Sequence, residues 1–300
     1  MPRFVSVGEC MIEMSGGEDG QYRLGYAGDT LNTAWYARAK LPKDWDVDYA
    51  TALGDDIYSQ QMVDFFVANG IGIGHIQKIE GRRPGLYMIH QKDGDRHFTY
   101  WRGQSAAKLM TEHPEALNAA LAGADIAYFS GISLAILAPR ARGRLMKAIH
   151  TAREAGARVA FDPNERPALW TSPRVMGSTI AAAAILADVV LPTFPDEHAL
   201  FGDASPPAVA ERYLSWGAEE VVVKNGAEPA YVASRESHGW VAPRPGANSV
   251  DPTGAGDSFN GAYLAARAQG ASPLEAAAMA HDVAATVIGH KGALVPHARL

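Results

Sequence analysis

The sequence predicts an α/β fold in which a mostly parallel sheet carries helices on both faces. Short runs of β-branched and aromatic residues alternate along the chain with longer segments of helical periodicity, which is the pattern of strand–helix–strand units. The chain has 300 residues and 47% of them are hydrophobic, which is enough to bury a large core. We therefore expect residues 1–300 to form a single domain.

The expected strands and helices follow from local composition. Five short apolar runs should form strands, at residues 4–7, 126–129, 159–161, 189–191 and 221–223. Apolar residues recur at intervals of three and four in segments 140–155 and 206–216, so we expect helices there. A sheet of this kind binds ligands beyond the carboxyl ends of its strands, where the strand order changes direction.

Residues 82–102 depart from this pattern. Two strand-like runs flank Lys92-Asp93-Gly94-Asp95, in which the Asp-Gly pair favours a hairpin turn with positive φ. We expect an antiparallel hairpin that joins residues 10–26 in a small β lid, inserted over the ligand cleft of the main domain. An ordinary edge hairpin is the alternative. Because exposed strand edges invite pairing, we also expect a homo-oligomer.

Charge and cysteine content limit the partners and the compartment. The formal net charge is −6 and the chain has no dense run of lysine or arginine, so we expect no nucleic-acid partner. No stretch reaches the roughly 20 apolar residues of a membrane span, and no apolar signal segment begins the chain. Cys10 is the single cysteine, which rules out an intrachain disulfide. These features predict a cytoplasmic protein without a membrane partner, in which Cys10 is buried.

The clearest chemical signature lies near the C-terminus. Segment 251–261 (Asp-Pro-Thr-Gly-Ala-Gly-Asp-Ser-Phe-Asn-Gly) precedes a good helix-forming stretch, so Gly254 and Gly256 would stand at a helix start. Free amides of a first helical turn bind phosphate. Asp257 beside them could accept the proton of a substrate hydroxyl while the amides stabilise a transferring phosphoryl group. Alternatively, Asp257 or Ser258 only caps the helix, and the spacing alone leaves both interpretations open.

Segment 251–265 resembles the C-terminal signature of the ribokinase-like, pfkB-type family of carbohydrate kinases. Residues 28–34 (Gly-Asp-Thr-Leu-Asn-Thr-Ala) are similar to the glycine-rich substrate motif of that family, and residues 51–56 to the segment that follows it. The resemblance implies a ribokinase-like α/β fold with a small β lid, and ATP and Mg²⁺ as cofactors. It also implies that Asp257 is the catalytic base, with Gly254, Ala255 and Gly256 beside it. Activation by a monovalent cation such as K⁺ is left open.

Within the family, the sequence is most similar to bacterial 2-keto-3-deoxygluconate kinases. Six motifs carry this likeness, at residues 8–13, 27–33, 84–87, 100–102, 130–137 and 162–167. The resemblance implies ATP-dependent phosphorylation of a sugar acid, with 2-keto-3-deoxygluconate converted to its 6-phosphate. The alternatives are a neutral-sugar kinase of the fructokinase or ribokinase type, a nucleoside kinase, and a non-catalytic sugar sensor. The intact Gly-Ala-Gly-Asp sequence argues against the sensor.

The resemblance further implies roles for individual residues. The sugar acid would be bound by Gly28, Asp29, Asn32, Tyr87, Tyr100, Arg102, Arg166 and Asp257. ATP would be bound by Asn164, Arg166, Lys224, Gly226, Gly254 and Gly256. Glu197 would assist Mg²⁺ indirectly, although the asparagine common before that acid in the family is missing from residues 190–197.

Arg102 and Arg166 suit an acidic substrate on chemical grounds. A guanidinium group can form two parallel hydrogen bonds with a carboxylate, and a neutral sugar would leave that capacity unused. Either arginine could instead carry a solvated surface charge or form a structural ion pair. Their neighbours, Tyr100-Trp101 and Asn164-Glu165, favour the substrate role.

Overall fold

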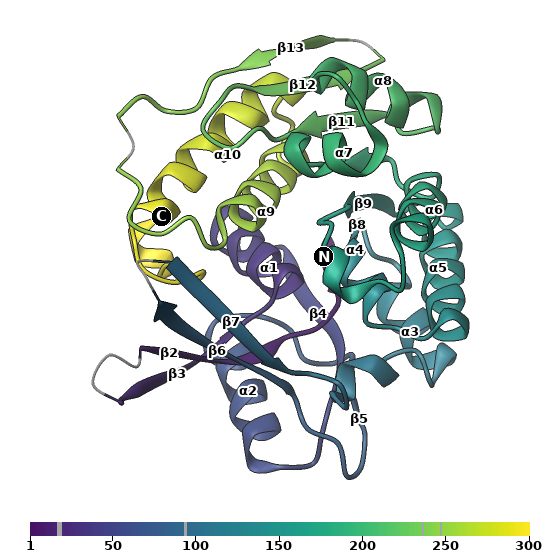
Figure 1. Ribbon diagram of the computed structural model, residues 1–300. Helices are drawn as coiled ribbons and strands as arrows, with labels where there is room; N and C mark the ends of the chain where they lie inside the picture. The colour runs from purple at the N-terminus through teal and green to yellow at the C-terminus, as the bar shows by residue number, and fades with distance from the viewer. Residues whose placement is uncertain (17–19, 93–94, 236, 247) are drawn as a thin grey trace.

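The computed structural model describes residues 1–16, 20–92, 95–235, 237–246 and 248–300. The strands of these residues form one sheet of nine strands and one of four (Figure 1). In spatial order, the strands of the large sheet are β13 (His238–Val241), β12 (Ala230–Ser234), β11 (Glu220–Val223), β10 (Val189–Val190), β9 (Arg158–Asp162), β8 (Ile126–Ser130), β1 (Arg3–Val7), β4 (Asp46–Leu53) and β5 (Ile76–Lys78). The strands from β11 to β5 run parallel, whereas β12 and β13 pair antiparallel at one edge.

Helices cover both faces of the large sheet, and each face has its own hydrophobic core. One face carries α1 (Asp29–Lys40), α2 (Ile57–Ala68), α9 (Ala255–Ala268) and α10 (Pro273–Ile288). The other carries α3 (Pro114–Leu121), α4 (Gly131–Ala135), α5 (Pro139–Glu154), α6 (Pro173–Ala184), α7 (Phe194–Phe201) and α8 (Pro206–Ser215). Figure 1 shows α1, α9 and α10 across strands β8 and β9 from α5 and α6. Short 3₁₀ turns lie at Ala106–Leu109, Pro167–Leu169 and His297–Arg299.

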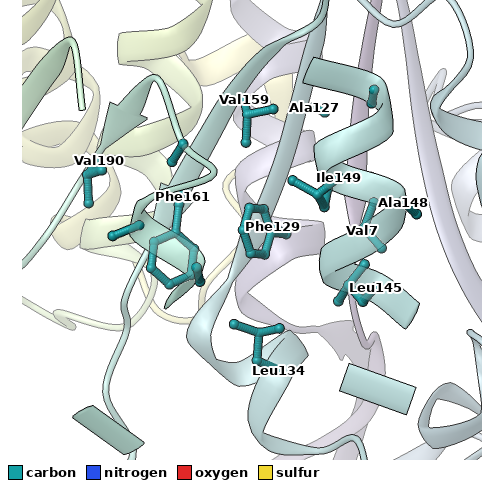
Figure 2. Packing of buried hydrophobic residues seen from close by; sticks show 14 of the residues in the cluster. Val7, Ala127, Phe129, Leu134, Leu145, Ala148, Ile149, Val159, Phe161 and Val190 are labelled. Atoms are coloured by element: carbon teal, nitrogen blue, oxygen red, sulfur yellow. The ribbon is translucent and has the colours of Figure 1, made fainter. Parts of the chain in front are cut away.

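The residues beneath α5 illustrate how the helices pack on the strands (Figure 2). Leu145 and Ile149 of α5 are fully buried against the sheet, together with Phe129 of β8 and Phe161 of β9. The two phenylalanine rings stack with centroids 4.8 Å apart. Burying one such side chain contributes about 1.5–3 kcal/mol. Because neighbouring side chains of a strand point to opposite faces, these parallel strands are apolar on both sides.

Serine and proline define where several helices begin. Ser172, Ser205 and Ser272 are the N-caps of α6, α8 and α10, and each accepts a hydrogen bond from the amide three residues later. Each serine precedes a proline, which fits the first helical turn because its missing N–H would lack a partner there. In α10, Glu275 bonds back to the amide of Ser272 and completes a capping box.

The α/β fold predicted from the sequence is confirmed. Each of the five expected strands lies in the parallel part of the large sheet, and the two expected helices are α5 and α8. The antiparallel edge does not follow from the apolar runs, because β13 has only four residues and they alternate between exposed and half-buried positions. Among the described residues, no helix is both long and apolar enough to cross a bilayer.

The second sheet, called the small sheet below, contains β3 (Tyr22–Ala27), β2 (Met11–Gly16), β6 (Gly85–Lys92) and β7 (Asp95–Trp101), in this order. Strands β6 and β7 form the expected antiparallel hairpin. The predicted turn residues Asp93 and Gly94 lie outside the described residues. Met11, Ala27, Tyr87 and Ile89 of the small sheet pack in one cluster with Ala293, a residue beyond α10. The small sheet therefore rests against the C-terminal part of the main domain.

Candidate functional site

The carboxyl ends of the central strands place polar side chains at one edge of the large sheet. Ser130 ends β8, Asp162 ends β9, and Lys224 directly follows β11. The N-termini of two helices reach the same edge, since Asp29 of α1 is hydrogen-bonded to Ser130 and Gly256 of α9 lies beside Lys224. This is the edge at which sheets of this kind bind ligands.

Helix α9 begins with a close approach between two parts of the backbone. Its N-cap is Gly254, with φ +79°, and a Cβ atom there would lie 2.8 Å from the carbonyl oxygen of Ala293, so glycine is required. The amide of Ala255 is already bonded to a carbonyl oxygen of the preceding turn (3.1 Å). Among the described residues, the amides of Gly256 and Asp257 have no acceptor. Two amides at a helix start are thus available to an anion.

The carboxyl group of Asp257 lies in this first turn and is oriented by α1. Asn32 Nδ2 donates a hydrogen bond of 2.7 Å to Asp257 Oδ2. Burial, followed by the charge of Asp29, raises the pKa of Asp257 to about 7, while the Asn32 hydrogen bond and the Lys224 charge oppose this effect. Gly254 is the N-cap, so capping does not explain this aspartate. A carboxyl group that titrates near neutral pH is suited to accept a proton.

Asp29 faces the loop that follows β9. Asn164 Nδ2 donates to Asp29 Oδ2 (2.9 Å). Asn164 has φ +36° and is the one non-glycine residue with a positive φ among the described residues. Such backbone strain costs about 1–3 kcal/mol and is common at functional sites. The pKa of Asp29 is raised, because the effect of burial outweighs the hydrogen bonds from Ser130 and Asn164 that lower it. Gly28 precedes Asp29, and its Cβ would lie 2.2 Å from the Glu9 carbonyl oxygen, so the turn is closely packed.

A buried ion pair lies behind the start of α9. Lys224 Nζ donates to Asp162 (2.8 Å) and Asn260 (3.1 Å), and Asn260 Nδ2 also donates to Asp162 (2.6 Å). A Cβ atom on Gly256 would lie 3.7 Å from Lys224 Nζ, which places the ammonium group beside the two open amides. Gly226, two residues after Lys224, has φ +61°. Asp162 and Asn260 were not predicted as site residues, because they are 98 positions apart and neither stands out from its motif.

Tyr87, Tyr100 and Arg102 come together on the small sheet. The rings of the two tyrosines are 5.7 Å apart, and the Arg102 guanidinium lies 5.9 Å from the Tyr100 ring. Tyr87 donates a hydrogen bond to Glu13, and Arg102 forms an ion pair with Glu9. Burial and the charge of Glu13 raise the pKa of Tyr87, so its hydroxyl remains protonated. Neither glutamate was predicted as a site residue, although both lie in the 8–13 motif.

Arg166 lies apart from Arg102, on the loop after β9. Its side chain is exposed, and its Nη1 donates to the carbonyl oxygen of Glu165 (2.7 Å). The Glu165 side chain is buried, and neither of its carboxyl oxygens has a hydrogen-bond partner among the described residues. Burial and the charge of Glu197 raise the pKa of Glu165 to about 9. The loop thus exposes the Arg166 cation and buries the neighbouring acid Glu165.

Glu197 itself does not face the site in the way expected of a metal-assisting acid. Its side chain is 0% exposed and accepts hydrogen bonds from Arg212 (2.6 Å) and Tyr213 (2.7 Å) of α8. The preceding residue, Asp196, is half-buried, and its pKa is raised by burial and lowered by the charges of Arg166 and Lys224. Asp196 is therefore the acid of α7 whose pKa responds to the charges of Arg166 and Lys224. The sequence could not distinguish them, because the direction of a helical side chain depends on packing.

Comparisons with known proteins agree with this geometry. The chain is 41% identical over 299 residues to the 2-dehydro-3-deoxygluconokinase of Escherichia coli K12, which covers 97% of this chain and 96% of that protein. The 2-dehydro-3-deoxygluconokinase of Haemophilus influenzae is 37% identical over 301 residues, with 98% and 96% covered. A PfkB protein structure from Polaromonas sp. JS666 superposes with a TM-score of 0.84 at 29% identity and covers 95% of each chain. A model of the pfkB family carbohydrate kinases matches residues 1–298, and the chain therefore belongs to that family.

Proposed function

We propose that this protein is a sugar-acid kinase that transfers the γ-phosphoryl group of ATP to the 6-hydroxyl of 2-keto-3-deoxygluconate. The observation that carries the proposal is the position of Asp257, whose carboxyl group stands beside two open amides of α9 and within the electrostatic influence of Lys224. The activity printed for the relatives at 41% and 37% identity supports this substrate.

The chemistry assigned to the chain is proton transfer and charge stabilisation. Asp257 takes the hydroxyl proton while the substrate oxygen bonds to the γ-phosphorus and the bond from that phosphorus to ADP breaks. The amides of Gly256 and Asp257 stabilise the charge on the transferring group, and the Lys224 ammonium reinforces them from behind. Pre-aligned donors of this kind act most strongly where water is excluded.

The sugar acid is proposed to lie between α1, the loop after β9 and the small sheet. Asp29 and Asn164 offer an acceptor and a donor to the sugar hydroxyls from the turn that Gly28 opens. Arg102 approaches from the small sheet, and Arg166 extends from the opposite loop toward carboxylate or phosphate. Both guanidinium groups keep donors for an anionic ligand.

ATP and Mg²⁺ are the proposed cofactors. A ribokinase II structure from E. coli in complex with ATP and Mg²⁺ superposes with a TM-score of 0.85 at 21% identity and covers 98% of this chain and 94% of that chain, which shows a shared fold. Mg²⁺ uses few protein carboxylates and binds largely through phosphate oxygens and water. Among the described residues, no three His, Cys, Asp or Glu side chains form a metal site. Asp196 fits an indirect contact better than Glu197, which is bonded to α8.

K⁺ activation is proposed on the loop before α9. Asp251 is 1% exposed and accepts hydrogen bonds from Thr253 Oγ1 (2.7 Å) and from the amide of Gly292 (2.6 Å). Hard cations take oxygen ligands, and Asp251 supplies a carboxylate close to the start of α9. Rates measured in KCl, NaCl and tetramethylammonium chloride test the idea, and equal rates in all three would contradict it.

We propose that the small sheet is a lid inserted into a single cytoplasmic kinase domain, and that its outer face forms a homo-oligomer contact. A hollow of about 910 Å³ lies between that face, residues 81–84 and 103–105, and the start of α2. The small sheet contributes Ile12, Met14, Leu24, Leu86, Met88 and Trp101 to its lining. Trp101 is 56% exposed. Asp56, Arg82 and Arg83 line the same hollow, so a two-fold contact through it would bring charges of both signs to the interface. Light scattering of wild type and Trp101→Glu tests the oligomer.

The function is tested by ADP release with a panel of acceptors. The panel contains 2-keto-3-deoxygluconate, 2-keto-3-deoxygalactonate, gluconate, fructose, ribose and adenosine. We expect the highest kcat/KM with one of the two 2-keto-3-deoxy acids, and phosphorus NMR should place the phosphate on the 6-hydroxyl. A higher kcat/KM for fructose, ribose or adenosine would replace the sugar-acid assignment with a neutral-sugar or nucleoside kinase.

A further inference from the structure

Glu9 and Arg102 form an ion pair where the two sheets meet. Glu9 lies between β1 of the large sheet and β2 of the small sheet, and Arg102 directly follows β7. Arg102 Nη2 contacts Glu9 Oε2, and the two side chains are 14% and 1% exposed. The residues are 93 positions apart, so the pair fixes how the end of β7 meets the main domain.

The surrounding backbone leaves this pair little freedom. A Cβ atom on Gly85 would lie 2.9 Å from Glu9 Oε1 and 3.2 Å from Arg102 Cβ, so glycine is what makes room for both side chains. On the other side, the Glu9 carbonyl oxygen packs against Gly28. Glu9 therefore connects the arginine proposed to bind the substrate acid with the turn proposed to bind its hydroxyls.

The placement of Arg102 depends on this one acceptor. Among the described residues, Glu9 is the hydrogen-bond acceptor of Arg102, and Arg102 Nε is buried with no partner. A largely buried guanidinium that loses its hydrogen-bond acceptor has no partner left to hold its orientation. Among the described residues Arg102 Nη1 has no acceptor, so its N–H groups can donate to an oxygen of a ligand.

We propose that Glu9 is a positioning residue that orients Arg102 toward the substrate carboxylate, an inference that rests on the proposed sugar-acid kinase function. Glu9 holds one corner of the guanidinium and leaves the other donors to the substrate. The negative charge of Glu9 would repel a carboxylate ligand, so Glu9 favours substrate binding only through the orientation that it gives to Arg102. Glutamine, which keeps an acceptor oxygen at the same place, should therefore replace Glu9 well, whereas alanine should not.

A double-mutant cycle tests this role. KM for 2-keto-3-deoxygluconate, KM for ATP, kcat and Tm are measured for Glu9→Ala and Glu9→Gln, each with Arg102 intact and with Arg102→Ala. We expect Glu9→Ala to raise KM for the sugar acid about tenfold or more and KM for ATP less than about twofold, with Glu9→Gln within about threefold of wild type. In the Arg102→Ala background, Glu9→Ala should change KM for the acid by less than about twofold.

Two further variants keep the test decisive. Glu220→Gln is the control for a disturbed buried ion pair, because Glu220 is 2% exposed, pairs with Arg158 and Arg267, and begins β11 at the end opposite Lys224. It should lower Tm and leave KM for the acid unchanged. If Glu9→Ala does not fold, Glu9→Asp takes its place, since the shorter side chain keeps the charge but withdraws the acceptor from Arg102 Nη2 and should raise the same KM.

The outcomes separate this inference from the proposed function. An equal rise of KM with and without Arg102 would overturn the positioning role, and so would a Glu9→Gln variant as impaired as Glu9→Ala. Preference of the wild type for a neutral sugar would contradict the proposed function instead. The same cycle is then measured with that sugar: coupling between the two substitutions supports the positioning of Arg102 by Glu9, and additive effects contradict it.

Discussion

Asn32 Nδ2 lies 2.7 Å from Asp257 Oδ2, so a side chain of α1 holds the proposed base of α9. The two helices are in direct backbone contact nearby, because a Cβ atom on Gly261 would lie 2.4 Å from the carbonyl oxygen of Thr33. Thr33 Oγ1 also donates to the main-chain oxygen of Asp257 (3.3 Å). Helix packing therefore sets the position of the carboxyl group.

Replacement of Asp257 by asparagine should separate catalysis from folding. The shape and the contact with α1 are kept while the proton acceptor is lost, so kcat should fall by about 10² to 10⁴. Tm should change little, because Gly254 and not Asp257 caps the helix. ADP release and thermal unfolding by circular dichroism measure the two effects. A kcat within about threefold of wild type, far short of a general-base effect, would show that Asp257 is structural.

The pH dependence of kcat/KM should report the ionisation of Asp257. Because the base must be ionised and its pKa is raised to about 7, kcat/KM should fall as the pH drops through this value. Asn32→Ala removes a hydrogen bond to the charged form and should move this limb to higher pH. Asp29→Asn removes a nearby negative charge and should move it to lower pH. If both substitutions moved the acidic limb of kcat/KM in the same direction, this limb could not be assigned to Asp257.

Much of the fold could be predicted from the sequence, because periodicity is a local signal. Asp257, the proposed base, could also be singled out, since its neighbours form a distinctive motif. The residue that orients Asp257 could not be predicted. Asn32 was expected to bind sugar, and its hydrogen bond to Asp257 spans 225 positions of the chain. Contacts of this kind arise from the packing of α1 on α9, which no local spacing reveals.

The acid assigned to metal assistance shows the same limit. Asp196 and Glu197 are adjacent, and the resemblance to the family implied Glu197. In the structure Glu197 is buried against Arg212, whereas Asp196 feels the charges of Arg166 and Lys224. Which of two neighbouring helical residues faces a site depends on how the helix packs. Here the packing of α7 on α8 turns Glu197 toward Arg212 and Tyr213.

Gly254→Ala should impair nucleotide binding as well as stability. The residue has φ +79° and its Cβ would meet Ala293, so the start of α9 must move. We expect KM for ATP to rise about tenfold or more, since the open amides shift with it. Gly270→Ala is the matched control: Gly270 has φ +89° and open space around its Cβ position, so it should lose about 1–2 kcal/mol of stability without a change in KM. Similar KM values for ATP in both variants would contradict the binding of an anion by the first turn of α9.

Alanine at Arg102 or Arg166 should weaken binding of the sugar acid. Loss of a charge-assisted hydrogen bond at a desolvated site corresponds to about 1.5–3 kcal/mol, or a rise in KM of about 10- to 150-fold. KM for ATP should rise less, particularly for Arg102, which lies on the small sheet. Lysine at either position keeps the charge but loses the forked geometry, so it should restore binding only in part. An unchanged KM for the acid in both alanine variants would contradict acid recognition by these residues.

Glu165→Gln should stabilise the protein in a pH-dependent manner. The pKa of Glu165 is raised to about 9, so the carboxyl group is neutral in the folded state and ionised in the unfolded state between about pH 4.5 and about pH 9. Stability of the wild type should therefore fall as the pH rises through this window, by up to about 1.4 kcal/mol per pH unit. A glutamine stays neutral throughout this range.

Urea unfolding at about pH 5.5, 7 and 8 measures this difference. The advantage of Glu165→Gln over wild type should grow with pH. Glu220→Gln is the contrasting control: burial disfavours the ionised Glu220, but hydrogen bonds from Arg267 and Tyr263 outweigh it and lower its pKa. Its carboxylate is charged in both states over this range, so the substitution should destabilise the fold by a constant amount. A Glu165→Gln advantage that is independent of pH would show that Glu165 is not held protonated by burial beside Glu197.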